Sequence, residues 1–199
     1  MRGSTWSFAT SYDILDEILQ SMLRWSTNLT AETVGLSASI AAGGRPESLP
    51  QSAGLMSEWM QQRLGARRPA FVDHSGLGPD SRITAADMVQ CLIAAGPQGA
   101  LRGLMRSHAM RDENGATMAD HPVEVSAKTG TLNFVSTLAG YAQAPSGRLI
   151  AFAVFCADLP RREALTLAEA ERPRGGRSYS RRARRLQQAM IERWAAVYG

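Results

Sequence analysis

Apolar residues recur at every third or fourth position through much of the chain, which is the spacing of one buried helix face. In the first such stretch, SYDILDEILQSMLR, isoleucine, leucine and methionine gather on one side. Glycines follow two of the later stretches, at Gly43 and Gly65, and are typical helix stops. The spacing predicts helices over residues 11–24, 29–42, 51–65, 84–96, 98–108 and 178–198.

The pattern changes after residue 122 to runs of β-branched and apolar residues, which are typical of strands. Three such runs cover residues 123–131, 133–144 and 148–158. The Pro145-Ser146-Gly147 turn between the last two predicts a hairpin. Helices, then antiparallel strands, then a helix indicate an α+β fold, an antiparallel sheet packed with helices, rather than a doubly wound parallel sheet.

The composition is that of one globular domain. The 199 residues are 44% hydrophobic and 20% charged, which is enough chain for a single core. The net charge of +4 is unevenly placed, because residues 161–199 hold ten arginines against four glutamates. Such a segment is compatible with nucleic-acid binding, but no helix-turn-helix, RNA-recognition or zinc-finger pattern accompanies it. A solvated, arginine-rich helix face is the alternative.

The cysteines, histidines and apolar runs bear on three features: disulfides, metal sites and membrane or export segments. Cys91 and Cys156 lie within apolar runs and are expected to be buried free thiols, although a disulfide stays open. The histidines have no metal-ligand spacing, and His108 and His121 are expected at the surface. The longest apolar run, Leu149–Ala157, is too short to span a membrane, and the first residues lack the apolar stretch of a secretory signal.

One lysine stands among 22 basic residues, and it begins the tripeptide Lys128-Thr129-Gly130 at the end of a strand-like run. Penicillin-binding proteins and serine β-lactamases combine K-T-G with an S-x-N element and an S-x-x-K nucleophile. Ser26-Thr27-Asn28 supplies S-x-N earlier in the chain. S-x-x-K is absent, because Val125 stands three residues before Lys128 and there is no second lysine.

With these motifs the chain resembles the C-terminal part of a penicillin-binding protein of the D-alanyl-D-alanine carboxypeptidase/endopeptidase type, the S13-type serine peptidases. Three segments carry the resemblance: RWSTNLTAETVG, FVDHSGLGPDSRITAADMVQCL and the K-T-G region through FAVF. The resemblance implies a partial β-lactamase/transpeptidase-like fold. Residues 1–199 would then be the C-terminal part of a transpeptidase-like domain whose S-x-x-K part is absent.

The resemblance also implies roles for six residues. Ser26 would relay a proton towards the leaving amine, Lys128 would attract the substrate carboxylate, and the amide of Asn28 would bind a substrate carbonyl or an ammonium. Hydroxyls on the K-T-G strand would bind the same carboxylate, and its glycine would let the substrate lie close to the backbone. The catalytic residues are thus Ser26, Asn28 and Lys128, and the substrate-binding residues are Thr129, Gly130 and Thr131.

Other interpretations of these residues stay open. Ser26 and Asn28 are also favoured helix caps, and Lys128 is also a typical solvated residue of a strand edge. The loop that begins Asp73-His74-Ser75 resembles a D-G-S-G-L-S loop of the family, with His74 in place of glycine. Adjacent residues in one turn point in different directions, so this loop is interpreted as structural rather than as a catalytic triad.

The sequence therefore predicts a serine-type D-Ala-D-Ala carboxypeptidase or endopeptidase of peptidoglycan metabolism. Its substrate would be a stem peptide ending in D-Ala-D-Ala, and full-length members of the family would also bind β-lactams. No metal, organic cofactor or nucleic acid is expected as a partner. Because S-x-x-K is absent, a truncated chain, a split protein that associates with a missing N-terminal portion, and a non-catalytic muropeptide-binding remnant all remain possible. The resemblance implies a periplasmic location.

Overall fold

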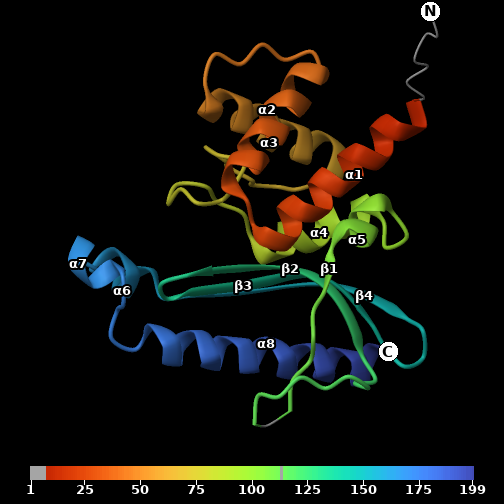
Figure 1. Cartoon of the computed structure of the whole chain (residues 1–199), viewed down its shortest axis with the longest axis vertical. Helices are drawn as coiled ribbons and strands as arrows, with labels where there is room; N and C mark the ends of the chain where they lie inside the picture. Colours follow the sequence, from red (N-terminus) through yellow and green to blue (C-terminus); the bar gives the residue numbers. More distant parts are fainter. Residues whose placement is uncertain (1–7, 113) are drawn as a thin grey trace, which may run out of the picture.

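A four-stranded antiparallel sheet lies at the centre of the computed structural model, which describes residues 8–112 and 114–199 (Figure 1). The strand order along the sheet follows the chain, β1-β2-β3-β4. The strands are β1 (Arg106–Ser107), β2 (Glu124–Leu132), β3 (Val135–Gln143) and β4 (Leu149–Ala157). The three strands predicted from the sequence are confirmed, as is the α+β class with an antiparallel sheet.

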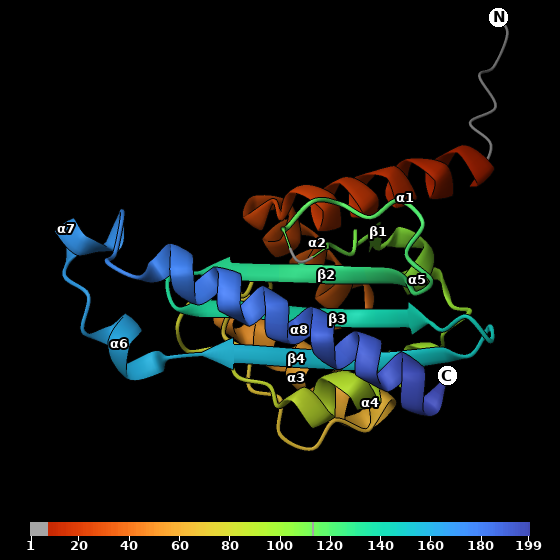
Figure 2. The same ribbon diagram turned by 90° about the horizontal axis from the view of Figure 1, so that it is seen from below.

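Helices cover both faces of the sheet. Five helices gather on one face, and α8 (Gly176–Tyr198) runs along the other (Figures 1 and 2). Two short helices, α6 (Leu159–Glu163) and α7 (Leu167–Ala170), lie beyond one end of the sheet (Figure 2). The five helices of the first layer are α1 (Phe8–Trp25), α2 (Asn28–Ala41), α3 (Leu49–Leu64), α4 (Ala85–Ala95) and α5 (Ala100–Leu104).

One predicted helix is wrong in part of its length. The expected helix over residues 98–108 ends after one turn at Leu104, and the chain continues as β1. Arg106 and Ser107 pair with Ala127 and Ser126 of β2, so tertiary pairing outweighs the local helical pattern at this point. This short strand covers only the first half of the outer edge of β2.

The core lies between the sheet and α8. Leu138 of β3, Phe152 of β4 and Ile191 of α8 are each about 1% exposed and belong to one contiguous cluster. The sequence predicts Leu186, Met190, Trp194 and Val197 as the buried face of this helix. The buried stripe is instead Ala183, Gln187, Ile191 and Ala195, with Met190 and Trp194 packed beside it.

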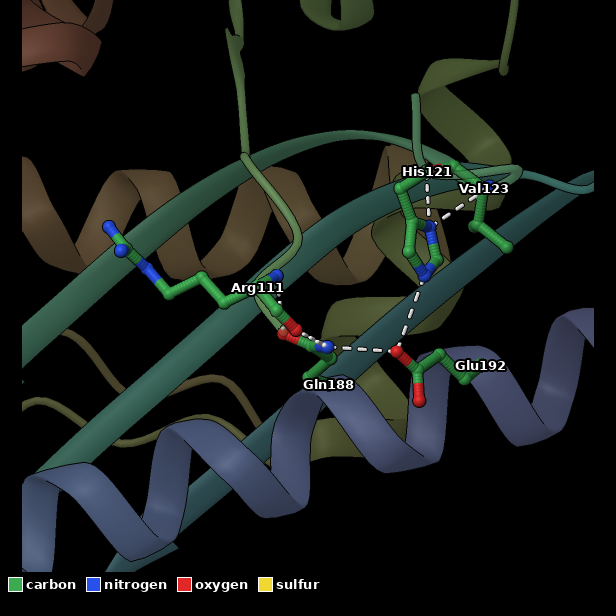
Figure 3. Close-up of polar contacts among 5 residues, drawn as sticks. All are labelled: Arg111, His121, Val123, Gln188 and Glu192. Carbon is green, nitrogen blue, oxygen red and sulfur yellow. Dashed lines mark hydrogen bonds and ion pairs between the residues drawn. The ribbon is translucent and has the colours of Figure 1, made fainter. Parts of the chain in front are cut away.

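The segment that leads from β1 to β2 is fastened to α8 by side-chain contacts (Figure 3). The side-chain amide of Gln188 donates to the carbonyl of Arg111 at 2.6 Å and accepts from the N–H of the same residue at 2.9 Å. His121 Nε2 lies 3.3 Å from Glu192 Oε1, and His121 Nδ1 accepts from the N–H of Val123. The side chain of His121 is only 11% exposed, so the expectation that it lies at the surface is wrong.

The two cysteines have the form expected from the sequence. Cys91 is buried and Cys156 half-buried, and both are free thiols. Among residues 8–112 and 114–199, none of the helices combines the length and the apolar character needed to cross a bilayer.

Candidate active site

Ser26 occupies the turn between α1 and α2 in an unusual backbone conformation. Its φ is 55°, in the left-handed region, and the N–H of Thr27 donates to the carbonyl of Met22 at 3.4 Å. This is the Schellman ending of a helix, in which the residue at the position of Ser26 is usually glycine because a side chain is strained there. A serine at such a position is retained at a cost of about 1 kcal/mol or more, which directs attention to its hydroxyl.

The hydroxyl of Ser26 meets the only lysine of the chain. Lys128 Nζ donates to Ser26 Oγ at 2.6 Å across 102 positions of sequence, and it also donates to the carbonyl of Thr129. Lys128 is half-buried, and burial lowers the pKa of its ammonium below the ordinary value of 10.5. The two motifs found in the sequence thus supply one hydrogen-bonded pair.

Asn28, the third predicted catalytic residue, begins α2 with an exposed side chain. The structure places it two residues after Ser26, and its side chain makes no hydrogen bond with another described residue. The alternative of helix capping does not hold for Ser26, because the N-cap of α2 is Thr27 and no side-chain cap bond forms there.

The pleat of β2 divides the K-T-G strand between two faces. Val125 and Ala127 face α8, and successive side chains of a strand point to opposite faces. Lys128 and Gly130 therefore lie on the other face, towards α1–α5. Thr129 and Thr131 are exposed on the opposite face. The sequence expects both threonines to bind the carboxylate held by Lys128, and the structure puts them across the strand from it.

The outer edge of β2 is open beside this pleat. β1 pairs only with Ser126 and Ala127, so within the described chain no strand pairs with Lys128–Leu132 on that side. Side chains of both faces flank a strand edge, and its unpaired N–H and C=O groups can pair with an extended peptide. A ligand along this edge would pass Lys128 on one side and the threonines on the other.

Gly130 has a packing reason as well as the expected functional one. A Cβ atom at this position would lie 2.4 Å from the hydroxyl of Thr137 on the neighbouring strand. Thr137 Oγ1 is in turn 3.5 Å from the carbonyl of Gly130. The glycine therefore permits the close approach of β2 and β3 next to the open edge.

The loop that begins Asp73-His74-Ser75 has a structural role, because its first three residues bind different partners and form no catalytic triad. Asp73 accepts from the hydroxyl of Ser81 at 2.5 Å, while His74 Nε2 lies 2.9 Å from the buried hydroxyl of Ser52. The N–H groups of His74 and Ser75 donate to a carboxylate of α2, that of Glu32. Burial raises the pKa of Glu32, but a hydrogen bond from the side chain of Ser75 and these two backbone hydrogen bonds outweigh it and lower the pKa below its ordinary value.

Glu32 is a residue that the sequence does not single out. It lies four positions after Asn28 on α2 and ties that helix to the loop that begins at Asp73. No local motif marks it, since a glutamate within a helix is ordinary and its partners are 42 and 43 residues away. Only the folding of the loop brings the N–H groups of His74 and Ser75 to the carboxylate of Glu32.

The S-x-N and K-T-G motifs are thus in contact at one edge of an antiparallel sheet, and the sequence as a whole matches one peptidase family. The match to the D-Ala-D-Ala carboxypeptidase 3 (S13) family covers residues 8–171, most of the chain. The chain belongs to this family.

A curated relative agrees with the assignment. Carboxypeptidase DacB of Mycolicibacterium smegmatis is 29% identical over 167 residues, which cover 77% of this chain and 36% of that protein. The chain thus spans about a third of the length of this curated relative.

Solved structures support the fold. Penicillin binding protein 4 from Haemophilus influenzae, also solved with a β-lactam, has a TM-score of 0.64 at 21% identity over 89% of this chain and 40% of its own. A class A β-lactamase from Bacteroides cellulosilyticus has a TM-score of 0.51 at 20% identity over 94% of this chain and 71% of its own. The β-lactamase/transpeptidase-like fold is therefore confirmed.

A glycine at position 26 tests the strained turn of this S13 chain. Ser26→Gly should raise the free energy of unfolding by about 0.5 kcal/mol, because the left-handed φ costs glycine nothing. Ser26→Ala keeps the strained φ and should be about 1 kcal/mol less stable than the glycine variant. Urea unfolding of both variants measures the difference, and an alanine variant as stable as the glycine variant would contradict this account.

Proposed function

We propose that this chain supplies the S-x-N and K-T-G half of a serine-type D-Ala-D-Ala carboxypeptidase or endopeptidase acting on peptidoglycan. The observation that carries the proposal is the 2.6 Å hydrogen bond between Lys128 Nζ and Ser26 Oγ. It joins the two motifs at an open strand edge, where a peptide ending in a carboxylate can pair with the backbone. No metal or organic cofactor takes part in the proposed reaction.

The proposed chemistry assigns each residue a task that its position permits. The Lys128 ammonium attracts the terminal carboxylate of the substrate and orients the Ser26 hydroxyl, which passes a proton to the leaving amine. The amide of Asn28 binds a substrate carbonyl, and the hydroxyls of Thr129 and Thr131 hold the substrate from the far side of the strand. The backbone N–H that follows Gly130 donates to the developing oxyanion.

The nucleophile itself is proposed to come from a further segment. The 199 residues hold one lysine, so a serine with its own S-x-x-K lysine has to be supplied from outside this sequence. The outer edge of β4 is also unpaired within the described chain, which suits the docking of further strands of the same sheet. Residues 1–199 are thus proposed as the C-terminal part of a transpeptidase-like domain that associates with an N-terminal portion.

Binding of β-lactams belongs to that assembled domain. The Haemophilus influenzae neighbour was solved with a β-lactam, and a β-lactam carries a carboxylate of the kind that Lys128 would attract. Activity on peptidoglycan would place the assembled protein outside the cytoplasm, in the periplasm of a cell with two membranes.

The experiment is a binding titration combined with penicillin labelling of the same protein. We expect saturable, non-covalent binding of an N-acylated peptide ending in D-Ala-D-Ala, and clearly weaker binding of the peptide ending in L-Ala-L-Ala. A fluorescent penicillin should give no covalent band, because the S-x-x-K nucleophile is absent. Covalent labelling would refute the assignment of the nucleophile to another segment, and equal affinity for both peptides would refute the proposed substrate.

A further inference from the structure

A pocket of about 560 Å³ lies between α1 and the segment that leads from α5 into β1. This volume falls in the range of about 300–1,000 Å³ that is common for small-molecule sites. Helix α1 contacts both α5 and β1 at this place (Figure 1). One wall of this α1–β1 pocket is residues 103–107, and the other is Glu17, Gln20, Ser21, Arg24 and Trp25.

Trp25, the last residue of α1, supplies the one aromatic ring of the α1–β1 pocket. It is 66% exposed. The guanidinium of Arg24 lies 5.1 Å from the ring centroid, and this cation–π contact holds the indole in place. A guanidinium covers one face of a ring, so the other face of Trp25 is open to a ligand. Tryptophan is among the side chains that contribute most to binding when a ligand covers it.

Polar side chains surround this ring and are not used within the protein. Glu17, Gln20 and Ser21 lie on one face of α1, at a spacing of three and four residues, and β1 contributes Ser107. Among the residues that the structure describes, none of these four side chains makes a hydrogen bond or ion pair with another. Their hydroxyl, amide and carboxylate groups can both donate to and accept from a ligand.

An open aromatic face within a ring of uncommitted polar groups fits a sugar. One side of a pyranose carries C–H groups whose partial positive charge suits the negative face of an aromatic ring. Its rim carries hydroxyls that need donors and acceptors at once, which the side chains around Trp25 supply. A purely anionic ligand fits less well, because Glu17 would repel it beside Arg24 and Arg106.

The pairing of β1 argues against an extended peptide in the same pocket. Arg106 and Ser107 pair with Ala127 and Ser126, so this part of the β2 edge already has its hydrogen bonds. A peptide that pairs with the open edge from Lys128 onward therefore stops where β1 begins. The α1–β1 pocket is left to a ligand that side chains hold.

This pocket lies beside the proposed active site. Trp25 directly precedes Ser26, and the residues that pair with β1 directly precede Lys128. We infer that the α1–β1 pocket binds a sugar residue of a glycan strand, next to the peptide at Lys128. The sugar site is carried by Trp25 and the polar groups around it, whereas its assignment to the glycan of peptidoglycan rests on the proposed function.

Binding of chitotetraose, a linear tetramer of N-acetylglucosamine, tests the inference. An NMR titration gives the affinity, and a change in tryptophan emission reports contact with the ring. Trp25→Ala should weaken binding about tenfold, and Gln20→Ala combined with Ser21→Ala about threefold. Trp25→Phe keeps an aromatic face, so its affinity should lie between those of the parent and Trp25→Ala.

Trp59 provides the matched control. It is 49% exposed on α3 and does not line the pocket, so Trp59→Ala should leave the affinity for chitotetraose unchanged. Equal affinity of the parent and Trp25→Ala would overturn the inference, as would an equal loss in Trp59→Ala. A tetraglutamate peptide that binds the parent more tightly than chitotetraose, and loses this affinity in Arg24→Gln, would overturn it in favour of an anion site.

Lys128→Ala separates this inference from the proposed function. Chitotetraose should bind this variant as it binds the parent, and Trp25→Ala should bind a D-Ala-D-Ala peptide as the parent does. If chitotetraose depends on Trp25 while the D-Ala-D-Ala peptide does not depend on Lys128, the proposed function fails and the sugar site stands. If the peptide depends on Lys128 and chitotetraose does not bind, the sugar-site inference fails alone.

Discussion

Lys128→Ala should lower the affinity of the protein for a peptide ending in D-Ala-D-Ala by about 30-fold. A hydrogen bond to a charged group contributes about 1.5–3 kcal/mol, and here the charge is half-buried and no second lysine can replace it. The variant also removes the partner of the Ser26 hydroxyl. Isothermal titration calorimetry of the parent and the variant with the same peptide measures the loss.

The pH dependence of the same binding gives a second measurement. Burial lowers the pKa of Lys128, so the ammonium loses its proton at a lower pH than a free lysine, whose value is 10.5. The charged form binds the carboxylate, so affinity should be constant at neutral pH and decline as the pH rises through the pKa of Lys128. The decline should therefore begin below pH 10.5.

Lys128→Arg separates the charge from the shape of the group. Its guanidinium keeps its charge at high pH, so any remaining binding should not decline over this range. Affinity should still fall below that of the parent at neutral pH, because the planar fork replaces a compact ammonium that bonds to Ser26. Unchanged affinity in Lys128→Ala, with circular dichroism showing a folded protein, would contradict the role of Lys128.

The fold was predictable where a pattern belongs to a local element. The runs around Val125, Leu138 and Phe152 have strand character in themselves, and each lies in a strand of the sheet. The helix expected over residues 98–108 is wrong in its last residues, because β1 forms there through its pairing with β2, which no local pattern indicates. In α3 the buried residues are Ser52, Ala53 and Ser57, whereas Trp59 is 49% exposed, so hydrophobicity identifies the helix but not its buried face.

The site was predictable as motifs, and its geometry was not. Lysine in K-T-G and serine in S-x-N identify the residues, but their contact depends on how α1 and β2 are packed in the fold. The left-handed turn at Ser26 has no signature, because helix ends of this kind are recognised by glycine.

Phe134 shows how the turn beside the K-T-G strand is held in place. It follows Asn133 in the two-residue connection between β2 and β3, and it is only 1% exposed. The guanidinium of Arg161 lies 4.3 Å from its ring centroid, and the ring of Tyr179 meets it edge-on at 5.8 Å. Its φ of 58° is a left-handed conformation that an aromatic residue rarely adopts. Burial of the ring therefore maintains a strained turn.

Phe134→Ala should lower the free energy of unfolding by about 4 kcal/mol, because it empties a buried site between β2, α6 and α8. Phe134→Gly should cost about 1 kcal/mol less than Phe134→Ala, although glycine is smaller, because it removes the strain of the positive φ. Urea unfolding followed by circular dichroism measures both values.

Phe152 provides the matched control, since it is equally buried but lies within β4 at an ordinary strand conformation. There glycine should be about 1 kcal/mol worse than alanine, because glycine weakens a strand interior. The order of the two variants should thus reverse between positions 134 and 152. If alanine is the better replacement at both, the left-handed turn stores no strain, and the ring of Phe134 acts by burial alone.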